Sequence, residues 1–301
     1  MCATMYVSFS ASQTMELNSL LLQLPDVLKK CREITNCPIL REEFYQLTKI
    51  HQAISSFRVI ISAPKPVQFF ESDDADFWSE FEGYFPPDDQ SRTCVFSMGR
   101  VYPLPVRYRV KIVQLFCPPL LKDQCITEAK SRAHVARILL GRTPDTSQRT
   151  APQRFFSTYN YPLTRDSAEK LGMDTVQIAQ QMGGLLAALH MGASSDAKDV
   201  EIVLGGDYDR GLIRNPKVWV LDFNQCSTVT LDHHCIPQLV DAFFENEAYF
   251  PRPREGDPLF ARFASGYIAA SSENAPKLLP LAKLFIEGIK VEQAKKDKLR
   301  K

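Results

Sequence analysis

The stretch Val218-Trp219-Val220-Leu221-Asp222-Phe223-Asn224 decides the fold that we expect for this chain. Its first four residues are apolar and predict a strand that is buried in the core. Residues 200–204 form a second apolar run, and the glycines and proline between the two runs predict a loop, so we expect a hairpin. Asp222 is therefore expected where a buried strand ends.

A helix is predicted before the hairpin, over residues 174–189, because apolar residues recur along one of its faces. His190 follows at the end of this helix. Kinase-like enzymes place such a helix end before their catalytic loop, and an Asp-Phe step after a strand holds the magnesium that bridges the nucleotide phosphates. The order of these elements predicts the large lobe of a kinase-type fold.

The first half of the chain is predicted to be mixed and the second half mainly helical. Further helices are expected at residues 15–34 (interrupted at Pro25), 41–57, 106–116, 236–245 and 276–298. Short strands are expected at residues 58–61, 95–98, 135–140 and 155–162, with an irregular acidic segment at 71–89 and a polar linker at 141–153. We therefore expect an α+β, protein-kinase-like fold with a reduced, atypical N-terminal lobe (1–143), a mainly helical C-terminal lobe (144–290) and a basic tail (291–301).

Composition narrows the class of protein. The 301 residues are 45% hydrophobic and 24% charged, which is typical of a globular chain with one large core or two lobes. The net charge of +1 provides no general attraction to nucleic acid, so no nucleic-acid partner is expected. No stretch approaches the length of a membrane span, and residues 1–24 do not read as a secretory signal.

The eight cysteines are too few to suggest a disulfide scaffold in a chain of this length. We expect an intracellular, cytoplasmic protein with reduced cysteines. The lysine-rich C-terminal tail is interpreted as a solvated helix end, and a nuclear address is the alternative interpretation.

Residues 71–89 carry eight acidic residues and no basic one, with aromatic residues between them. The aromatic residues of the overlapping segment 69–85 either pack on the protein while the carboxylates stay in water, which we favour, or form a contact for a basic partner. Residues 249–253 are similarly interpreted as an ordered loop, with a peptide-binding face as the alternative.

An ordered series of short motifs resembles a fungal family that contains a domain of unknown function and is labelled "zinc finger protein". The resemblance covers residues 40–270 and implies a kinase-like core of the aminoglycoside phosphotransferase or choline kinase type. It rests on residues 101–105 with Arg107, 139–142, 155–156, 160–163, 186–190, 196–205, 219–226, 242–246 and 249–253. The chain departs from this family at its start, where members have a glycine-rich opening, because its first glycine is Gly83. Close approach of a backbone to phosphate needs glycine, so we expect no phosphate-cradling loop in residues 1–82.

Four acidic residues are the candidate site. Asp196 and Asp199 are the candidate catalytic residues, as base or as second metal ligand, and Asp222 and Glu201 are the candidates for binding magnesium and ATP. Kinases have an asparagine five residues after the catalytic aspartate, and Glu201 stands at that position here. A glutamate can still bind magnesium. The alternative is that the aspartates cap turns and accept hydrogen bonds from backbone amides.

A lysine for the phosphates is not recognised in the first half of the chain, because Lys49 falls in a predicted helix and Lys65 lies between two prolines. His190 is expected to cap the end of its helix as a cation.

Zinc binding is a weaker hypothesis. Four possible ligands fall within ten residues, with two more cysteines far upstream, but their spacing fits no common zinc motif. These residues are Cys226, His233, His234 and Cys235, together with Cys31 and Cys37.

The sequence therefore predicts a kinase-like protein, a pseudokinase with weak or no activity, that acts as an intracellular binding or regulatory module. Its partner, a protein or a small molecule, is not specified by the residues. The alternatives are a divergent phosphotransferase that uses magnesium and ATP, and a zinc-binding regulator.

Overall fold

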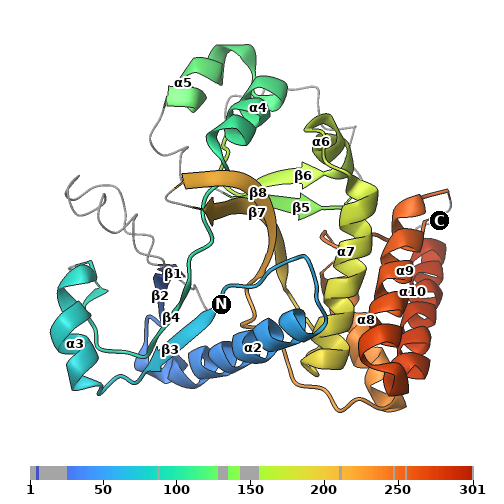
Figure 1. Ribbon diagram of the computed structural model, residues 1–301, viewed down its shortest axis with the longest axis horizontal. Helices are drawn as coiled ribbons and strands as arrows, with labels where there is room; N and C mark the ends of the chain where they lie inside the picture. The colour runs from blue at the N-terminus through green and yellow to red at the C-terminus, as the bar shows by residue number, and fades with distance from the viewer. Residues whose placement is uncertain are drawn as a thin grey trace.

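The computed structural model describes residues 5–6, 26–86, 89–127, 135–142, 156–209, 212–246, 248–254 and 256–299. The chain is a mixed α+β protein with two four-stranded sheets. Figure 1 shows the first sheet at one end of the molecule and a group of long helices at the other, with the second sheet between them. The mixed fold class predicted from the sequence is confirmed.

The N-terminal sheet has the order β1-β2-β4-β3, and all of its strands are antiparallel to their neighbours. These strands are β1 (Met5–Tyr6), β2 (Asp26–Lys30), β3 (Pro66–Phe70) and β4 (Val95–Gly99). Helix α2 (Cys37–Ser56) packs beside this sheet, and Pro38 in its first turn suits a helix start. The predicted strand 95–98 and helix 41–57 are confirmed.

Two predictions in this region are wrong. Residues 26–30, the end of the predicted helix 15–34, form β2, and residues 15–25 lie outside the described part of the chain. Residues 58–61 form a turn rather than a strand, because Arg58 takes a positive φ of 54° that breaks an extended conformation. The strand forms later, as β3.

The acidic segment is not irregular, because it contains helix α3 (Ala75–Phe81). Asp74 caps this helix by accepting a hydrogen bond of 2.9 Å from the backbone N–H of Phe77. Phe77 and Trp78 are buried against Phe85 and β4. Phe77, Trp78, Phe81 and Phe85 therefore pack on the protein, as favoured from the sequence, whereas Tyr84 is exposed.

The second sheet has the order β6-β5-β7-β8. β7 (Glu201–Asp209) and β8 (Leu212–Leu221) form the predicted hairpin with longer strands than expected. β5 (Ala136–Leu139) confirms the predicted strand at 135–140, whereas β6 (Tyr161–Thr164) begins later than predicted and runs parallel to β5. Most of the predicted linker, residues 143–153, lies outside the described residues.

The helices α4 (Val106–Phe116), α5 (Lys122–Thr127) and α6 (Arg165–Lys170) flank the second sheet (Figure 1). The segment before α4 joins the two sheets and pairs with β7 through the bridge between Tyr102 and Gly206. Ser62 forms a second bridge, to Trp219 on β8. The hairpin is thus anchored to the part of the chain that follows α2.

The C-terminal helices are α7 (Thr175–Ala187), α8 (Ile236–Glu245), α9 (Pro258–Asn274) and α10 (Leu279–Leu299). The predicted helices at 174–189, 236–245 and 276–298 are confirmed, and α9 was missed. α7 and α9 cross at two glycines, because a Cβ on Gly183 would lie 2.0 Å from the carbonyl oxygen of Phe263 and one on Gly266 would lie 2.1 Å from that of Gln180. No described helix is both long enough and apolar enough to span a bilayer.

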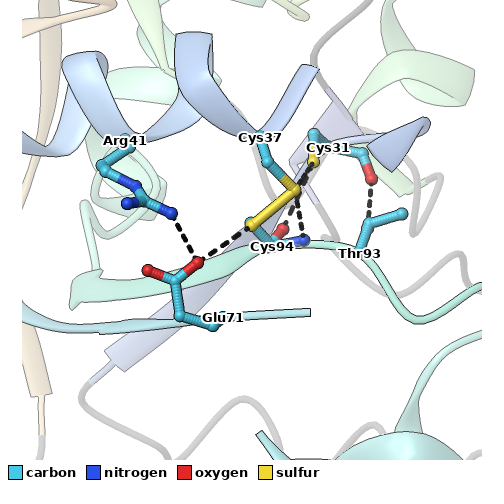
Figure 2. Close-up of a disulfide and its surroundings, with 6 residues drawn as sticks. All are labelled: Cys31, Cys37, Arg41, Glu71, Thr93 and Cys94. Carbon is cyan, nitrogen blue, oxygen red and sulfur yellow. Dashed lines mark hydrogen bonds and ion pairs between the residues drawn. A yellow bond between two sulfur atoms is a disulfide. The ribbon is translucent and has the colours of Figure 1, made fainter. Parts of the chain in front are cut away.

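A disulfide joins Cys37, at the start of α2, to Cys94, just before β4 (Figure 2). Cys31 lies beside it, with 3.8 Å between its Sγ and the Sγ of Cys37. Arg41 and Glu71 form an ion pair of 2.5 Å on the other side of the bond. This pair of cysteines differs from our expectation of reduced thiols.

Candidate functional site

A buried lysine lies where β2, α2 and the end of β8 meet. The side chain of Lys29 is fully buried, and its Nζ donates a hydrogen bond to Oε1 of Glu43 on α2. The same Nζ lies 3.8 Å from Oδ1 of Asp222. One cation therefore contacts two carboxylates that come from different parts of the chain.

Strand β2 is buried on both faces, and each face carries a paired lysine. Side chains alternate along a strand, so Lys29 points toward α2 whereas Lys30 points the other way. Lys30 Nζ donates to Oδ1 of Asp89 at 2.5 Å and to the Asp89 carbonyl oxygen at 2.8 Å. Because an unpaired buried charge is strongly destabilising, these partners allow two lysines to sit inside the fold.

The Asp222 carboxylate is held at the end of β8 by a left-handed backbone conformation, with φ of 63°. Phe223 is buried in the core and fixes the chain there. Oδ1 of Asp222 and Oδ1 of Asn224 are buried atoms without a hydrogen-bond partner among the described residues. Buried polar atoms normally have partners, and for Asp222 the ammonium of Lys29 at 3.8 Å supplies a compensating charge.

Asp199 and Glu201 lie near Asp222. Burial raises the pKa of Asp199, and the charge of Asp222 raises it further. Burial likewise raises the pKa of Glu201, with Arg137 opposing and with smaller contributions from Asp222 and Asp199. A cation beside Asp222 would remove the part of these shifts that comes from repulsion between carboxylates.

Glu201 and Asp199 differ in the hydrogen-bond partners of their carboxylates. Glu201 accepts a hydrogen bond of 2.5 Å from Arg137. Asp199, with φ of 58°, accepts a hydrogen bond from the side chain of Gln225. Asp199 is therefore the more available carboxylate beside Asp222.

Asp196 has a different role from these residues. It is buried, and its Oδ1 accepts hydrogen bonds from the backbone N–H groups of Ser227 at 2.8 Å and Lys198 at 3.2 Å. Its Oδ2 accepts another from Gln238 at 3.0 Å. Asp196 joins the loop before β7 to the loop after β8, which agrees with the turn-capping alternative for this residue.

His190 is fully buried rather than a cap at a helix end. It lies in a π-helical turn (Ala188–Gly192), where its Nδ1 is 2.9 Å from the hydroxyl of Tyr267. Its ring also packs edge-on against Phe285. Burial lowers the pKa of His190 to about 3, so the ring is neutral at pH 7 and the predicted cationic cap is wrong.

The hypothetical zinc ligands do not form one cluster. No group of three histidine, cysteine or acidic side chains suited to a metal occurs within the part of the chain that the structure describes. Cys226 is buried, with its Sγ 3.5 Å from the carbonyl oxygen of Lys198. The rings of His233 and His234 contact each other at a tilt of 39°, with 3.8 Å between their centroids.

Sequence reasoning missed Lys29 and Glu43. The signal was present in Val27-Leu28-Lys29, where an apolar pair precedes a lysine, and in a helix that begins a few residues later and carries an acidic residue. Glu43 occupies a buried helix position, where an acidic residue is rare unless paired. Burial raises the pKa of Glu43, and the charge of Lys29 lowers it.

Comparison with known families finds a match to part of the chain. The profile of a domain of unknown function described as "Zinc finger protein" matches residues 218–277, from β8 through α9. The chain is similar to that family over these residues, which confirms the corresponding part of the resemblance. Neither the curated proteins nor the solved structures contained a match.

Proposed function

We propose that this protein is a kinase-like protein that binds a magnesium–nucleotide complex, has weak or no phosphotransfer activity, and acts as a binding or regulatory module. The contact of Lys29 with both Glu43 and Asp222 is the observation that carries this proposal. In protein kinases a strand lysine pairs with a helix glutamate and contacts the phosphates, and an aspartate after a later strand holds magnesium. The order β2, α2, β8 reproduces the order of these parts.

The residues beside Asp222 fit a magnesium ion. Magnesium prefers oxygen ligands and is commonly held by one or two carboxylates together with substrate phosphates. Asp222 would supply one carboxylate and Asp199 the second, and phosphate oxygens and water would complete the ligand set, because Glu201 is already paired with Arg137. The bound ion would neutralise the negative charge of the phosphate oxygens. Lys29 is buried beside Asp222, so it would favour the bound complex through its charge rather than by direct contact with the phosphates.

We expect weak phosphoryl transfer because Asp196, a candidate catalytic base, is already engaged by the protein. A base for the acceptor hydroxyl must be able to approach it. Asp196 instead accepts three hydrogen bonds within the protein and is buried. The chain also lacks glycine before residue 83, so it has no glycine-rich loop to cover the phosphates from that region.

A divergent phosphotransferase is the second candidate, and Asp199 favours it. The raised pKa of Asp199 brings this carboxyl closer to the range in which a base accepts a proton at neutral pH. A zinc-binding regulator is the third candidate and rests on the description of the matched family. Metal analysis of the purified protein distinguishes it, because stoichiometric zinc would favour it over both others.

The melting temperature with and without magnesium–ATP tests the main proposal. A ligand that binds only the folded state must raise the midpoint. We expect a rise in the native protein, a much smaller rise in Asp222→Asn, and an unchanged rise in Asp241→Asn, where an exposed aspartate on α8 is the matched control. No rise at millimolar magnesium–ATP, or an undiminished rise in Asp222→Asn, would contradict nucleotide binding at this site.

A phosphate-release or acceptor-labelling assay separates the first two candidates once binding is established. Transfer that is lost in Asp199→Asn but retained in Asp241→Asn would favour the phosphotransferase. Binding without measurable transfer would favour the regulatory module.

A further inference from the structure

A cavity of about 620 Å³ lies between the C-terminal half of α2, the segment 58–65, the segment joining the two sheets and the β7–β8 hairpin. This volume falls in the range of pockets that hold small molecules. None of the acidic residues of the candidate site lines it, and neither does Lys29. The cavity is therefore a separate place in the fold, although β8 contributes to both.

Positive charge dominates the cavity wall. Its cationic lining residues are Arg58, Lys65, Arg100 and Lys217, and its one acidic lining residue is Asp207. The one ion pair within this set joins Lys217 to Asp207 at 3.7 Å. No carboxylate of the described residues pairs with Arg58 or Lys65. Because a concave wall of one sign concentrates the opposite charge, the cavity favours an anion.

The interior of the cavity also has an apolar, aromatic surface. Ile54, Val59 and Pro64 contribute aliphatic groups, and the indole of Trp219 lies among them. Lys217 Nζ lies 4.6 Å from the centroid of this indole ring. A flat apolar group has a ring to stack on, and the cation beside that ring is placed to meet a charged substituent.

Arg100 adds a further cation to the wall that carries Arg58 and Lys65. Burial lowers the pKa of Arg100 on the same wall, and an anion beside it would compensate for the lost water.

We propose that this cavity is a binding site for a small aromatic anion, in which a phosphate or carboxylate group contacts the cations and a flat ring packs against Trp219. The site is independent of the nucleotide proposed for Asp222. A ligand there would contact α2, the segment joining the sheets and the hairpin together.

Calorimetric titration of the full chain with phenyl phosphate, benzoate, phenol and inorganic phosphate tests this proposal. We expect phenyl phosphate or benzoate to bind at least ~10-fold more tightly than phenol and inorganic phosphate, because only the aromatic anions satisfy both the ring and the cations. The tighter of the two aromatic anions identifies the preferred acidic group.

Matched variants locate the binding. Arg58→Gln/Lys65→Gln should weaken the aromatic anion ~10-fold or more, and Trp219→Leu should weaken it as well. Lys277→Gln/Lys283→Gln removes two exposed lysines elsewhere and should leave the affinity unchanged, as should Asp222→Asn. Arg58 and Lys65 are exposed, so we expect Arg58→Gln/Lys65→Gln to fold. Its melting temperature checks this.

Three outcomes would overturn the proposal. The first is no binding of either aromatic anion at millimolar concentration. The second is binding of phenol as tightly as of the anions, which indicates an apolar cavity only. The third is full affinity in Arg58→Gln/Lys65→Gln, which places the anion elsewhere. Loss of nucleotide binding without loss of the aromatic anion would leave this inference intact, because the two sites use different residues.

Discussion

The ammonium of Lys29 lies 3.8 Å from the Asp222 carboxylate, although the two residues come from different sheets. Glu43 on α2 holds the same ammonium. The three side chains thus depend on the relative position of β2, α2 and β8, so a change in any of these elements alters the candidate site.

Replacement of Lys29 by methionine should destabilise the fold. Glu43 would keep a buried carboxylate without its cation, and loss of one partner of a buried ion pair typically lowers the free energy of unfolding by about 3–5 kcal/mol. Lys29→Met/Glu43→Leu removes both charges and should recover most of this loss. Urea denaturation at pH 7 measures both effects, and a double variant as unstable as the single one would contradict the pairing.

Alanine at Gly183 should also destabilise the fold, because its Cβ would lie 2.0 Å from the carbonyl oxygen of Phe263. α7 and α9 would have to separate, and overpacking of this kind typically costs about 1–3 kcal/mol or more. Gly184→Ala is the control, since its Cβ would meet only the Ala270 Cβ at 3.9 Å. Gly184→Ala should be neutral or stabilising by about 0.5–1 kcal/mol, because alanine is more favourable than glycine inside a helix. Equal melting temperatures for the two variants would argue against the close crossing.

Acid should destabilise the protein through His190. The unfolded imidazole binds a proton below pH 6.5, whereas the folded one does so only near pH 3. Between these values the unfolded state holds the extra proton, so the free energy of unfolding falls by about 1.4 kcal/mol for each unit of decreasing pH. This contribution is fully present above pH 6.5.

His190→Gln isolates that effect. The raised pKa values of Glu43, Asp199 and Glu201 act with the opposite sign, because these groups hold protons in the folded state that the unfolded state has released. They are common to both proteins, so the difference between the two pH profiles reports His190. Parallel profiles between pH 7 and pH 5 would show that His190 is not buried as a neutral ring.

Reduction of the Cys37–Cys94 disulfide should lower the free energy of unfolding. The bond closes a loop with a sequence separation of 57, and constraint of the unfolded chain by such a loop corresponds to about 4 kcal/mol. Dithiothreitol should therefore lower the melting temperature of the native protein. It should leave Cys37→Ala/Cys94→Ala unchanged, and an equal decrease in that variant would point to a cause other than this bond.

Sequence patterns predicted the C-terminal half well, because its elements have a strong local signal. The hairpin strands are apolar runs, and α7 and α8 carry a continuous apolar stripe. The position of Asp222 at the end of a strand followed from the same pattern, although only Val220 of the last four residues of β8 is fully buried. α9 was missed although Leu259, Phe263 and Tyr267 recur at helical spacing, and the Asp257-Pro258 start was a signal that could have found it.

The N-terminal sheet was harder to predict, because its stability depends on contacts between distant residues. Two adjacent lysines in Asp26–Lys30 indicate an exposed segment when read alone. Their burial requires Glu43 on one side and Asp89 on the other. The candidate site was likewise only partly predictable. Asp199, Glu201 and Asp222 could be proposed from motif spacing. The role of Asp196 in joining two loops is visible only from its hydrogen-bond partners.

Because Lys29 and Lys30 are buried, their reactivity measures whether the first sheet is intact. Trypsin cleaves after exposed lysines and needs an extended, accessible backbone, whereas both lysines are less than 3% exposed and their strand is paired on both sides. Amine-reactive reagents are excluded in the same way. The rate of cleavage or labelling at these two residues therefore depends on the fraction of molecules in which the first sheet has opened. A bound ligand that stabilises the sheet would slow both reactions.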